Sequence, residues 1–473
     1  MAKGRAFSLR PPEGEFTRAV SRAVLTVLAG VLGIAFAPAP LALAQSAAAS
    51  AGSRASQTPA PIFDQIEKMT AQLSEITGWK ARRKVPSEIL TKEKFRKYVE
   101  EQTKGRSKVK EIHAEELALK MFGLVPQDFN LAGEMEDLLD EQAAAFYDYH
   151  KKRVYVLNTT REGEDQRAAL VHELAHALAD QQHPLGKYLN AAGNDSDAAT
   201  AREAVMEGQA TWLTWAYETK QAGGRAEVSA RMLDRLTAED DEQNANYPVL
   251  SSAPLYVRES LLFPYNAGAR FQDAVFRRLG QRAFEAVFAQ GPASTQQILH
   301  PEEYLKKTAP TSPEPPMLDQ SSGVRARDFE AVLEGNVGEF DHAVLLRPYS
   351  STADALAAEH WRGGAFQLYE HKKLKYPVLA YTSEWDSEPA AQRYFQLYED
   401  ILRGKWRTMR IASRTDTEIR GLGDSGGFTV RLVGKTVQSV EGVNGPAQPA
   451  PANSPPARPG LADPGNLPPI AVN

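Results

Sequence analysis

The segment Leu170-Val171-His172-Glu173-Leu174-Ala175-His176-Ala177-Leu178 lies within a stretch, 165–182, that has the pattern of a helix. Two His residues four positions apart lie one above the other on the same helix face. The residues around the pair are apolar, which predicts that this helix is largely buried. A buried helix has no packing reason to carry two His and a Glu, so these side chains either bind a metal ion or are hydrogen-bonded core residues.

The composition is that of an ordinary globular protein. The chain has 473 residues, enough for two or three domains of ~150 residues each. The formal net charge is -5, and no strong basic block follows the N-terminus, so nucleic acid is a poor candidate partner. Because there are no cysteines, disulfides, thiol nucleophiles and thiolate ligands are excluded, and a zinc site must use His and carboxylates.

The N-terminus has the features of an export signal. A leader with five basic residues precedes an apolar run from Ala23 to Ala37, and Pro38 and Pro40 end that run. Ala42-Leu43-Ala44 has the small-x-small pattern of a signal-peptidase site, so we expect cleavage after Ala44 and a periplasmic or extracellular protein. The alternative is an uncleaved membrane anchor, although the run is short for a bilayer span of ~20 residues.

The pattern His172-Glu173-x-x-His176 is typical of zinc sites that hydrolyse peptide bonds. Both imidazoles can reach one Zn²⁺ ion, which lowers the pKa of its water and polarises a carbonyl. Glu173 points toward the open coordination position, where it can take a proton from water and pass it to the leaving amine. A catalytic zinc site needs a third protein ligand.

Downstream, Glu207-Gly208-Gln209-Ala210-Thr211 lies on a second expected helix, 197–222. Together with His172-Glu173-Leu174-Ala175-His176, this segment resembles the gluzincin zinc peptidases, whose aminopeptidase branch carries Asn-Glu-Gly-Phe-Ala-Thr here. The resemblance implies that Glu207 is the third ligand. Glu203, one helical turn earlier on nearly the same face, is the competing candidate.

Further candidates support the site. Pro264-Tyr265-Asn266-Ala267-Gly268 resembles the Pro-Tyr-x-x-Gly of the aminopeptidase branch, which implies that Tyr265 stabilises the oxyanion of the tetrahedral intermediate. His300 is the alternative donor. Asp180 continues the series 172, 176, 180 along one helix face and either orients a ligand His from behind or is an ordinary solvated or capping residue.

The resemblance covers roughly residues 140–270 and predicts a hydrolase. The wider arrangement also resembles an uncharacterised set of bacterial exported proteins; its motifs include Glu141-Gln142, Phe146-Tyr147-Asp148 and Ser294 to Pro301. Endopeptidase is slightly favoured over aminopeptidase, because 133–137 only faintly echoes an amine-binding Gly-x-Met-Glu-Asn segment. The expected hairpin 147–157 is the better candidate for an edge strand that pairs with the substrate backbone.

We expect an α+β fold: a mostly helical, zincin-like catalytic domain with a small sheet and edge hairpin, and a smaller α+β C-terminal domain. Expected helices include 134–146 and 388–402, and a hairpin is expected at 428–440. The predicted divisions are a signal peptide (1–44), a flexible linker (45–60), the catalytic domain (61–310), a Pro/Ser linker (311–325), the C-terminal domain (326–440) and a disordered tail (441–473).

Two classes of function remain open from the sequence. The first is a zinc peptidase that acts on a peptide or protein substrate. The second is an envelope binding or assembly protein that retains an idle zincin fold, in which the C-terminal domain does the work. The intact Glu173 argues for the peptidase, because an idle site has no need of a base at that position. The oligomeric state and the cleavage specificity do not follow from the sequence.

Overall fold

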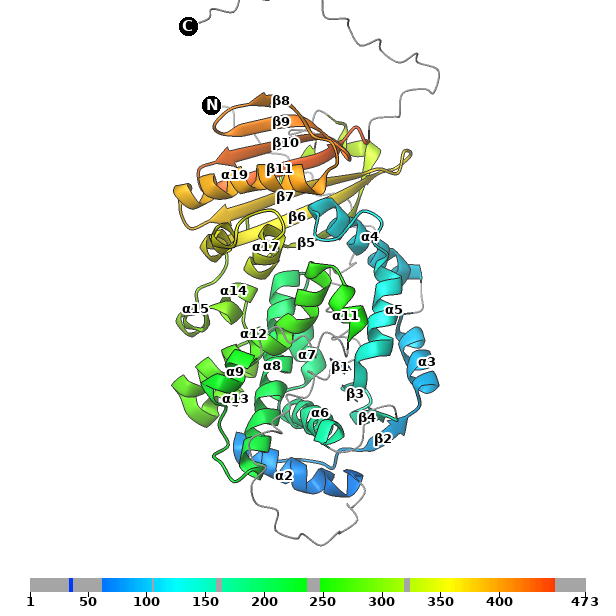
Figure 1. Cartoon of the computed structure of the whole chain (residues 1–473), viewed down its shortest axis with the longest axis vertical. Coiled ribbons are helices and arrows are strands. Elements are labelled where there is room, and N and C mark those ends of the chain that lie inside the picture. Colours follow the sequence, from blue (N-terminus) through cyan, green and yellow to red (C-terminus); the bar gives the residue numbers. More distant parts are fainter. Residues whose placement is uncertain are drawn as a thin grey trace, which may run out of the picture.

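The computed structural model describes residues 34–36, 62–103, 106–158, 164–235, 247–318 and 324–446. The expected linker 45–60, most of the expected leader and residues 447–473 of the expected tail lie outside these residues. The expected start of the tail at 441 is too early, because a strand runs from Thr436 to Val443. The expected α+β fold is confirmed: a largely helical body lies on one side, and an antiparallel sheet lies at the other end of the molecule (Figure 1). No helix in the described ranges is long and apolar enough to cross a membrane.

The helical body contains a small sheet and many helices. Its strands are β1 (Ile34–Phe36), β2 (Ser87–Leu90), β3 (Ala143–Asp148) and β4 (Arg153–Leu157). Its helices are η1 (Ile62–Gln65), α2 (Ile66–Thr77), α3 (Lys92–Thr103), α4 (Arg106–Phe122), α5 (Leu131–Gln142), α6 (Glu164–Gln182), α7 (Leu185–Asn190), α8 (Ser196–Gln221), α9 (Ala230–Arg235), α11 (Pro248–Ser252), α12 (Leu255–Leu279), η2 (Gly280–Arg282), α13 (Ala283–Ala289), α14 (Thr295–Leu299) and α15 (Pro301–Lys306).

The small sheet has the order β1-β3-β4-β2. β3 and β4 form the expected antiparallel hairpin, and β2 runs parallel to β4. The expected helix 134–146 is wrong at its C-terminal end, because α5 ends at Gln142 and β3 begins at Ala143. Three consecutive alanines favour a helix by intrinsic propensity, but pairing with β1 and β4 overrides that preference.

The second unit is a seven-stranded antiparallel sheet of order β5-β6-β7-β11-β10-β9-β8. Helix α19 packs on one face of the sheet (Figure 1). The expected hairpin at 428–440 is present as β10 and β11. The elements are η3 (Ala326–Asp328), β5 (Phe329–Asn336), α17 (Glu339–Leu346), α18 (Thr352–Ala355), η4 (Leu356–His360), β6 (Trp361–His371), β7 (Pro377–Trp385), α19 (Glu388–Lys405), β8 (Arg410–Arg414), β9 (Glu418–Gly423), β10 (Gly426–Val433) and β11 (Thr436–Val443).

The end of α4 joins the two units. Met121 and Phe122 belong to the same apolar core as the sheet and α19. The Lys405 ammonium donates to the Met121 carbonyl at 2.7 Å and pairs with the buried Glu441 carboxylate at 2.6 Å. The ion pair itself joins two elements of the second unit, and the Met121 carbonyl attaches the end of α4 to the same ammonium group.

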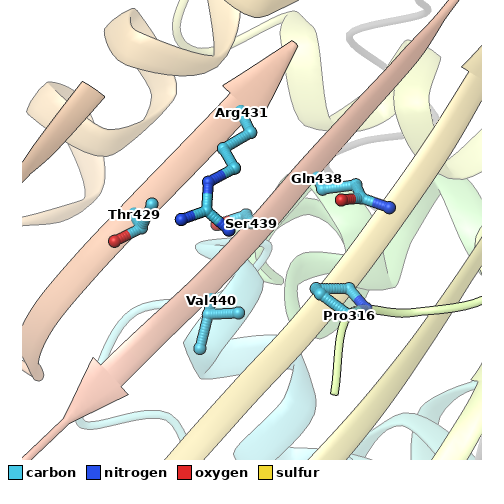
Figure 2. A pocket seen from close by; sticks show the side chains of 6 residues that line it. All are labelled: Pro316, Thr429, Arg431, Gln438, Ser439 and Val440. Carbon is cyan, nitrogen blue, oxygen red and sulfur yellow. The ribbon is translucent and has the colours of Figure 1, made fainter. Parts of the chain in front are cut away.

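The other face of the sheet is crossed by the segment around Pro316. Figure 2 shows Pro316 beside β10 and β11, where Thr429, Arg431 and Gln438 line a small depression. Its volume is about 10 Å³, and one water molecule needs roughly 10–15 Å³. The depression is therefore shallow.

Helices α8 and α12 approach each other at two glycines. A Cβ added to Gly208 would lie 2.0 Å from the Gly268 carbonyl carbon, and a Cβ added to Gly268 would lie 2.0 Å from the Ala204 oxygen. The two backbones are therefore in direct contact, which only glycine permits. This contact sets the position of Glu207, which directly precedes Gly208 on α8. It also sets the position of Tyr265, which lies one turn before Gly268 on α12.

Replacing Gly268 by Ala should push α12 away from α8. We expect the substitution to destabilise the protein by about 1–3 kcal/mol, the usual cost of overpacking a core. The measurement is the thermal midpoint of unfolding. The matched control is Asn266→Ala on the half-buried side of the same helix, which should shift the midpoint far less. An unchanged midpoint for Gly268→Ala would contradict the backbone contact.

Candidate metal centre

Helix α6 carries three polar side chains in an apolar environment. His172 and His176 are each 3% exposed and Glu173 is 0% exposed. Neighbours on the helix, including Val171 and Leu174, belong to the main apolar core. The helix is therefore buried, as its sequence predicts, and its polar groups must find partners within the protein.

The partner is Glu207 on α8. Its Oε2 atom lies 3.0 Å from His172 Nε2 and 3.2 Å from His176 Nε2, and the two imidazole nitrogens lie 3.1 Å apart. These three side chains form a buried group that could hold a metal ion. Ligand atoms of a tetrahedral zinc ion lie roughly 3.3 Å apart, given bonds of ~2.0–2.1 Å, so the spacing suits an ion of this size.

The protonation states also suit a metal. Burial would raise the pKa of Glu207, but His176 and His172 outweigh that effect and hold it at about 2. Burial lowers the pKa of His172. An ionised carboxylate is the form in which Glu207 can bind a metal ion.

Glu173 stands beside this group without belonging to it. Both carboxylate oxygens are buried without a well-aligned hydrogen bond. Burial first, and then the charge of Glu207, raise the pKa of Glu173 well above its ordinary value. The backbone N–H of Tyr147 on β3 faces the carboxylate and partly offsets the rise. A carboxylate in this setting binds protons readily and is suited to proton transfer.

Tyr265 lies next to the metal-ligand candidates. Its ring centroid is 6.0 Å from that of His172, and the side chain is buried. The Gly208–Gly268 contact explains this position, because Glu207 precedes Gly208 and Tyr265 precedes Gly268 by three residues. The two motifs that are separate in the sequence are thus brought together by close packing of their glycines.

Glu203 is buried one turn before Glu207, but it is not part of the ligand group found among the described residues. Asp180 accepts hydrogen bonds from Tyr147 (2.8 Å), the Lys152 ammonium (2.7 Å) and the Leu185 N–H (3.0 Å). These partners belong to the β3–β4 hairpin and to the start of α7. Asp180 therefore fastens the hairpin to the end of α6.

His300 lies elsewhere. Its Nε2 atom is 2.7 Å from Glu339 Oε1, at the start of α17, and this hydrogen bond raises the pKa of His300. The neighbouring Thr295 contacts Asp197 at the N-terminal end of α8 through its N–H and hydroxyl. The motif 294–301 therefore joins the helical body to the C-terminal unit, and the structure does not bring His300 to the metal group.

Sequence reasoning missed two contributions to the site. One is the backbone of Tyr147 beside Glu173, because the hairpin was expected to begin only at that residue. The other is the packing role of Gly208 and Gly268. Each glycine is part of a motif that the sequence analysis quotes. Their shared packing role could have been inferred from their positions, because each lies within three residues of a candidate functional side chain.

The comparisons with known proteins concern the C-terminal unit. A domain of unknown function, DUF8575, matches residues 327–450. No curated protein matches the chain, and no solved structure does so either. The matched residues cover the seven-stranded sheet and α19, and the metal group lies outside them.

Replacing Glu207 by Gln should remove a negatively charged ligand from the metal group. We expect zinc affinity to fall by more than roughly 100-fold. Removing a residue that only hydrogen-bonds to a metal ligand already lowers metal affinity by roughly 10–100-fold. The measurement is competition for Zn²⁺ with a chromophoric chelator. The matched control, Glu203→Gln, should keep near-normal affinity. The reverse ranking of the two variants would identify Glu203 as the ligand.

Proposed function

We propose that the protein is a zinc-dependent peptidase. The observation that carries the proposal is the buried Glu173 carboxylate, which lacks a well-aligned hydrogen bond, beside the His172–His176–Glu207 group. A structural metal site needs ligands only, and its coordination positions are all filled by the protein. A hydrolytic metal site, in contrast, combines three protein ligands with a nearby carboxylate that can bind a proton.

Zinc is the metal that the donors favour. Two imidazoles and one carboxylate suit Zn²⁺, and three protein ligands leave one position for water or substrate. When bound, the ion would polarise the scissile carbonyl and lower the pKa of water. His172, His176 and Glu207 would hold it, and their burial would keep the site dry.

Glu173 supplies the proton transfers. Its carboxylate accepts the proton of the attacking water and then donates that proton to the nitrogen of the leaving amine. A raised pKa helps the second step, because the carboxylic acid must persist long enough to donate. Tyr265 would donate its hydroxyl hydrogen to the oxygen that becomes negatively charged; its ring near that of His172 supports this role.

An endopeptidase is favoured over an aminopeptidase. The segment 133–137, which echoes an amine-binding motif, lies within α5 as an ordinary helical stretch. We further propose export, on the basis of the basic leader, the apolar run and the Ala42-Leu43-Ala44 pattern. Peptides or proteins outside the cytoplasm would then be the substrates.

Glu173→Gln tests the function directly. The variant should retain stoichiometric zinc, because Glu173 is not a ligand, but its kcat/KM on a peptide mixture should fall by roughly 10²–10⁴ or more. Product mapping by mass spectrometry measures both rate and bond position. Full activity in the variant would contradict the mechanism. Stoichiometric zinc without turnover in the unaltered protein would instead favour a binding or assembly protein.

Tyr265→Phe tests the oxyanion donor. The variant should lower kcat by roughly 10²–10³ with little change in KM, because the hydroxyl acts where charge develops in the transition state. His300→Ala is the comparison, and its kcat should stay near that of the unaltered protein, since His300 pairs with Glu339. A larger loss with His300→Ala than with Tyr265→Phe would reverse the assignment.

A further inference from the structure

The helical body meets the C-terminal sheet around α4 and α17 (Figure 1), and a cavity lies at this junction. Its walls come from α4 and the first turns of α8 and α12 on one side, and from β5, β6 and α17 on the other. Its volume is about 70 Å³. Because one water molecule needs roughly 10–15 Å³ of such space, the cavity has room for a ligand of about five non-hydrogen atoms.

The buried part of the cavity lining is apolar and partly aromatic. Phe122 of α4 and Phe366 of β6 are both buried, and their rings meet edge to face with centroids 5.3 Å apart. Leu119 and Val337 are buried beside them in the same lining. An apolar wall of this kind binds the hydrocarbon part of a ligand, and aromatic rings also attract cations.

The polar part of the lining is acidic. The carboxylates of Glu115 on α4 and Asp341 on α17 are half-buried at the cavity. Asp341 accepts hydrogen bonds from the Gly338 N–H at 2.7 Å and from the Tyr256 hydroxyl at 2.8 Å. A carboxylate has about four acceptor sites, so Asp341 can accept further hydrogen bonds. Among the described residues that line the cavity there is no Lys, Arg or His, so a positive charge must come from a ligand.

A third carboxylate adds negative charge to this junction. Asp197 follows Ser196, which lines the cavity, and is 3% exposed. Its Oδ1 atom accepts hydrogen bonds from Thr295, whereas its Oδ2 atom has no hydrogen-bond partner among the described residues. Burial raises the pKa of Asp197 well above its ordinary value, Thr295 partly offsets the rise, and the charge of Asp341 adds to it. Neighbouring carboxylates repel one another unless a proton or a cation compensates, which favours a cationic ligand here.

We infer that this cavity is a binding site for a small organic cation, namely a primary ammonium group that carries a short apolar chain. The ammonium group donates its hydrogens to the carboxylates of Glu115 and Asp341. The chain lies against Phe122 and Phe366, where it is removed from water. A ligand in this position contacts both units of the protein and stabilises their attachment, because it binds the joined arrangement.

This site is distinct from the metal group. Thr200, which lines the cavity, precedes Glu207 by seven residues, a distance of roughly 10 Å along the axis of α8. A bare metal ion does not suit the cavity, because aromatic and aliphatic walls offer no ligand atoms. Among the described residues, metal-ligand spacing is found only in the group of the His pair and Glu207. The inference goes beyond the proposed hydrolysis and does not depend on it.

The first experiment titrates the full chain with n-butylammonium chloride at physiological salt, followed by ligand-observed NMR. Uncharged n-butanol, which has nearly the same shape, is the comparison. We expect saturable binding of n-butylammonium with a Kd on the order of 1 mM, as a ligand of this size allows. Binding of n-butanol should be at least roughly tenfold weaker, the effect of one hydrogen bond to a charged group. Absence of saturable n-butylammonium binding, or equal affinity for the two compounds, would overturn the inference.

The second experiment removes charge from the cavity. Glu115→Gln and Asp341→Asn each change the shape little and should weaken n-butylammonium binding by roughly tenfold or more. The matched control is Glu334→Gln, which removes one charge from the exposed side of β5. Glu334 is adjacent to Leu333 of the cavity wall, and adjacent strand residues point to opposite faces. The control should bind as the unaltered chain does, and an equal loss in the control would show attraction to general surface charge instead of a site.

The third experiment fills the cavity without changing its charge. Ala118 is buried in the α4 wall, and Ala118→Leu places extra carbon atoms in the space that the ligand chain needs. We expect at least a roughly tenfold loss of n-butylammonium affinity, with unchanged helix content by circular dichroism. Because Asp341 also accepts the Gly338 N–H at the start of α17, the Asp341 variant alone does not decide the location. Normal affinity in both Ala118→Leu and Glu115→Gln would place the binding elsewhere and sink the inference.

Discussion

The contact between α6 and α8 at Glu207 is the interaction on which the rest of the site depends. A buried carboxylate costs several kcal/mol in lost hydration unless charge and hydrogen bonds compensate for it. Here the compensation comes from two imidazoles, whose nitrogens lie 3.0 and 3.2 Å from Glu207 Oε2. The apolar core around these groups excludes water, so a cation at this point would be held by all three ligands. The need to satisfy these groups therefore fixes the pairing of the two helices.

Much of this arrangement could be predicted from the sequence, because it depends on local periodicity. The four-residue spacing of His172 and His176 defines a helix face, and α6 begins and ends within one residue of the expected 165–182. The expected position of Glu207 on a second helix is also confirmed by α8. The assignment of zinc, of the catalytic roles and of the export signal goes beyond this geometry and stays a prediction.

The features that could not be predicted depend on contacts between distant residues. Ala143, Ala144 and Ala145 look helical in isolation and become a strand only because β4 and β1 lie on either side. The apolar run near the N-terminus has the composition of a leader, and nothing in its local pattern indicates pairing with β3. Likewise, the sequence places α4 in the first domain, whereas Met121 and Phe122 complete the core of the second.

Helix α8 links these observations physically. Its first residue, Ser196, exchanges hydrogen bonds with Asn336 of β5, and the next, Asp197, binds Thr295. Eleven residues after Ser196, the same helix presents Glu207 to the His pair, at a distance along the axis of roughly 16 Å. A helix buried along most of its length is stiff on this scale. The C-terminal sheet is therefore attached to the element that carries the third ligand, so a displacement of that sheet relative to the body would act on α8 as well as on the other elements that join the two units.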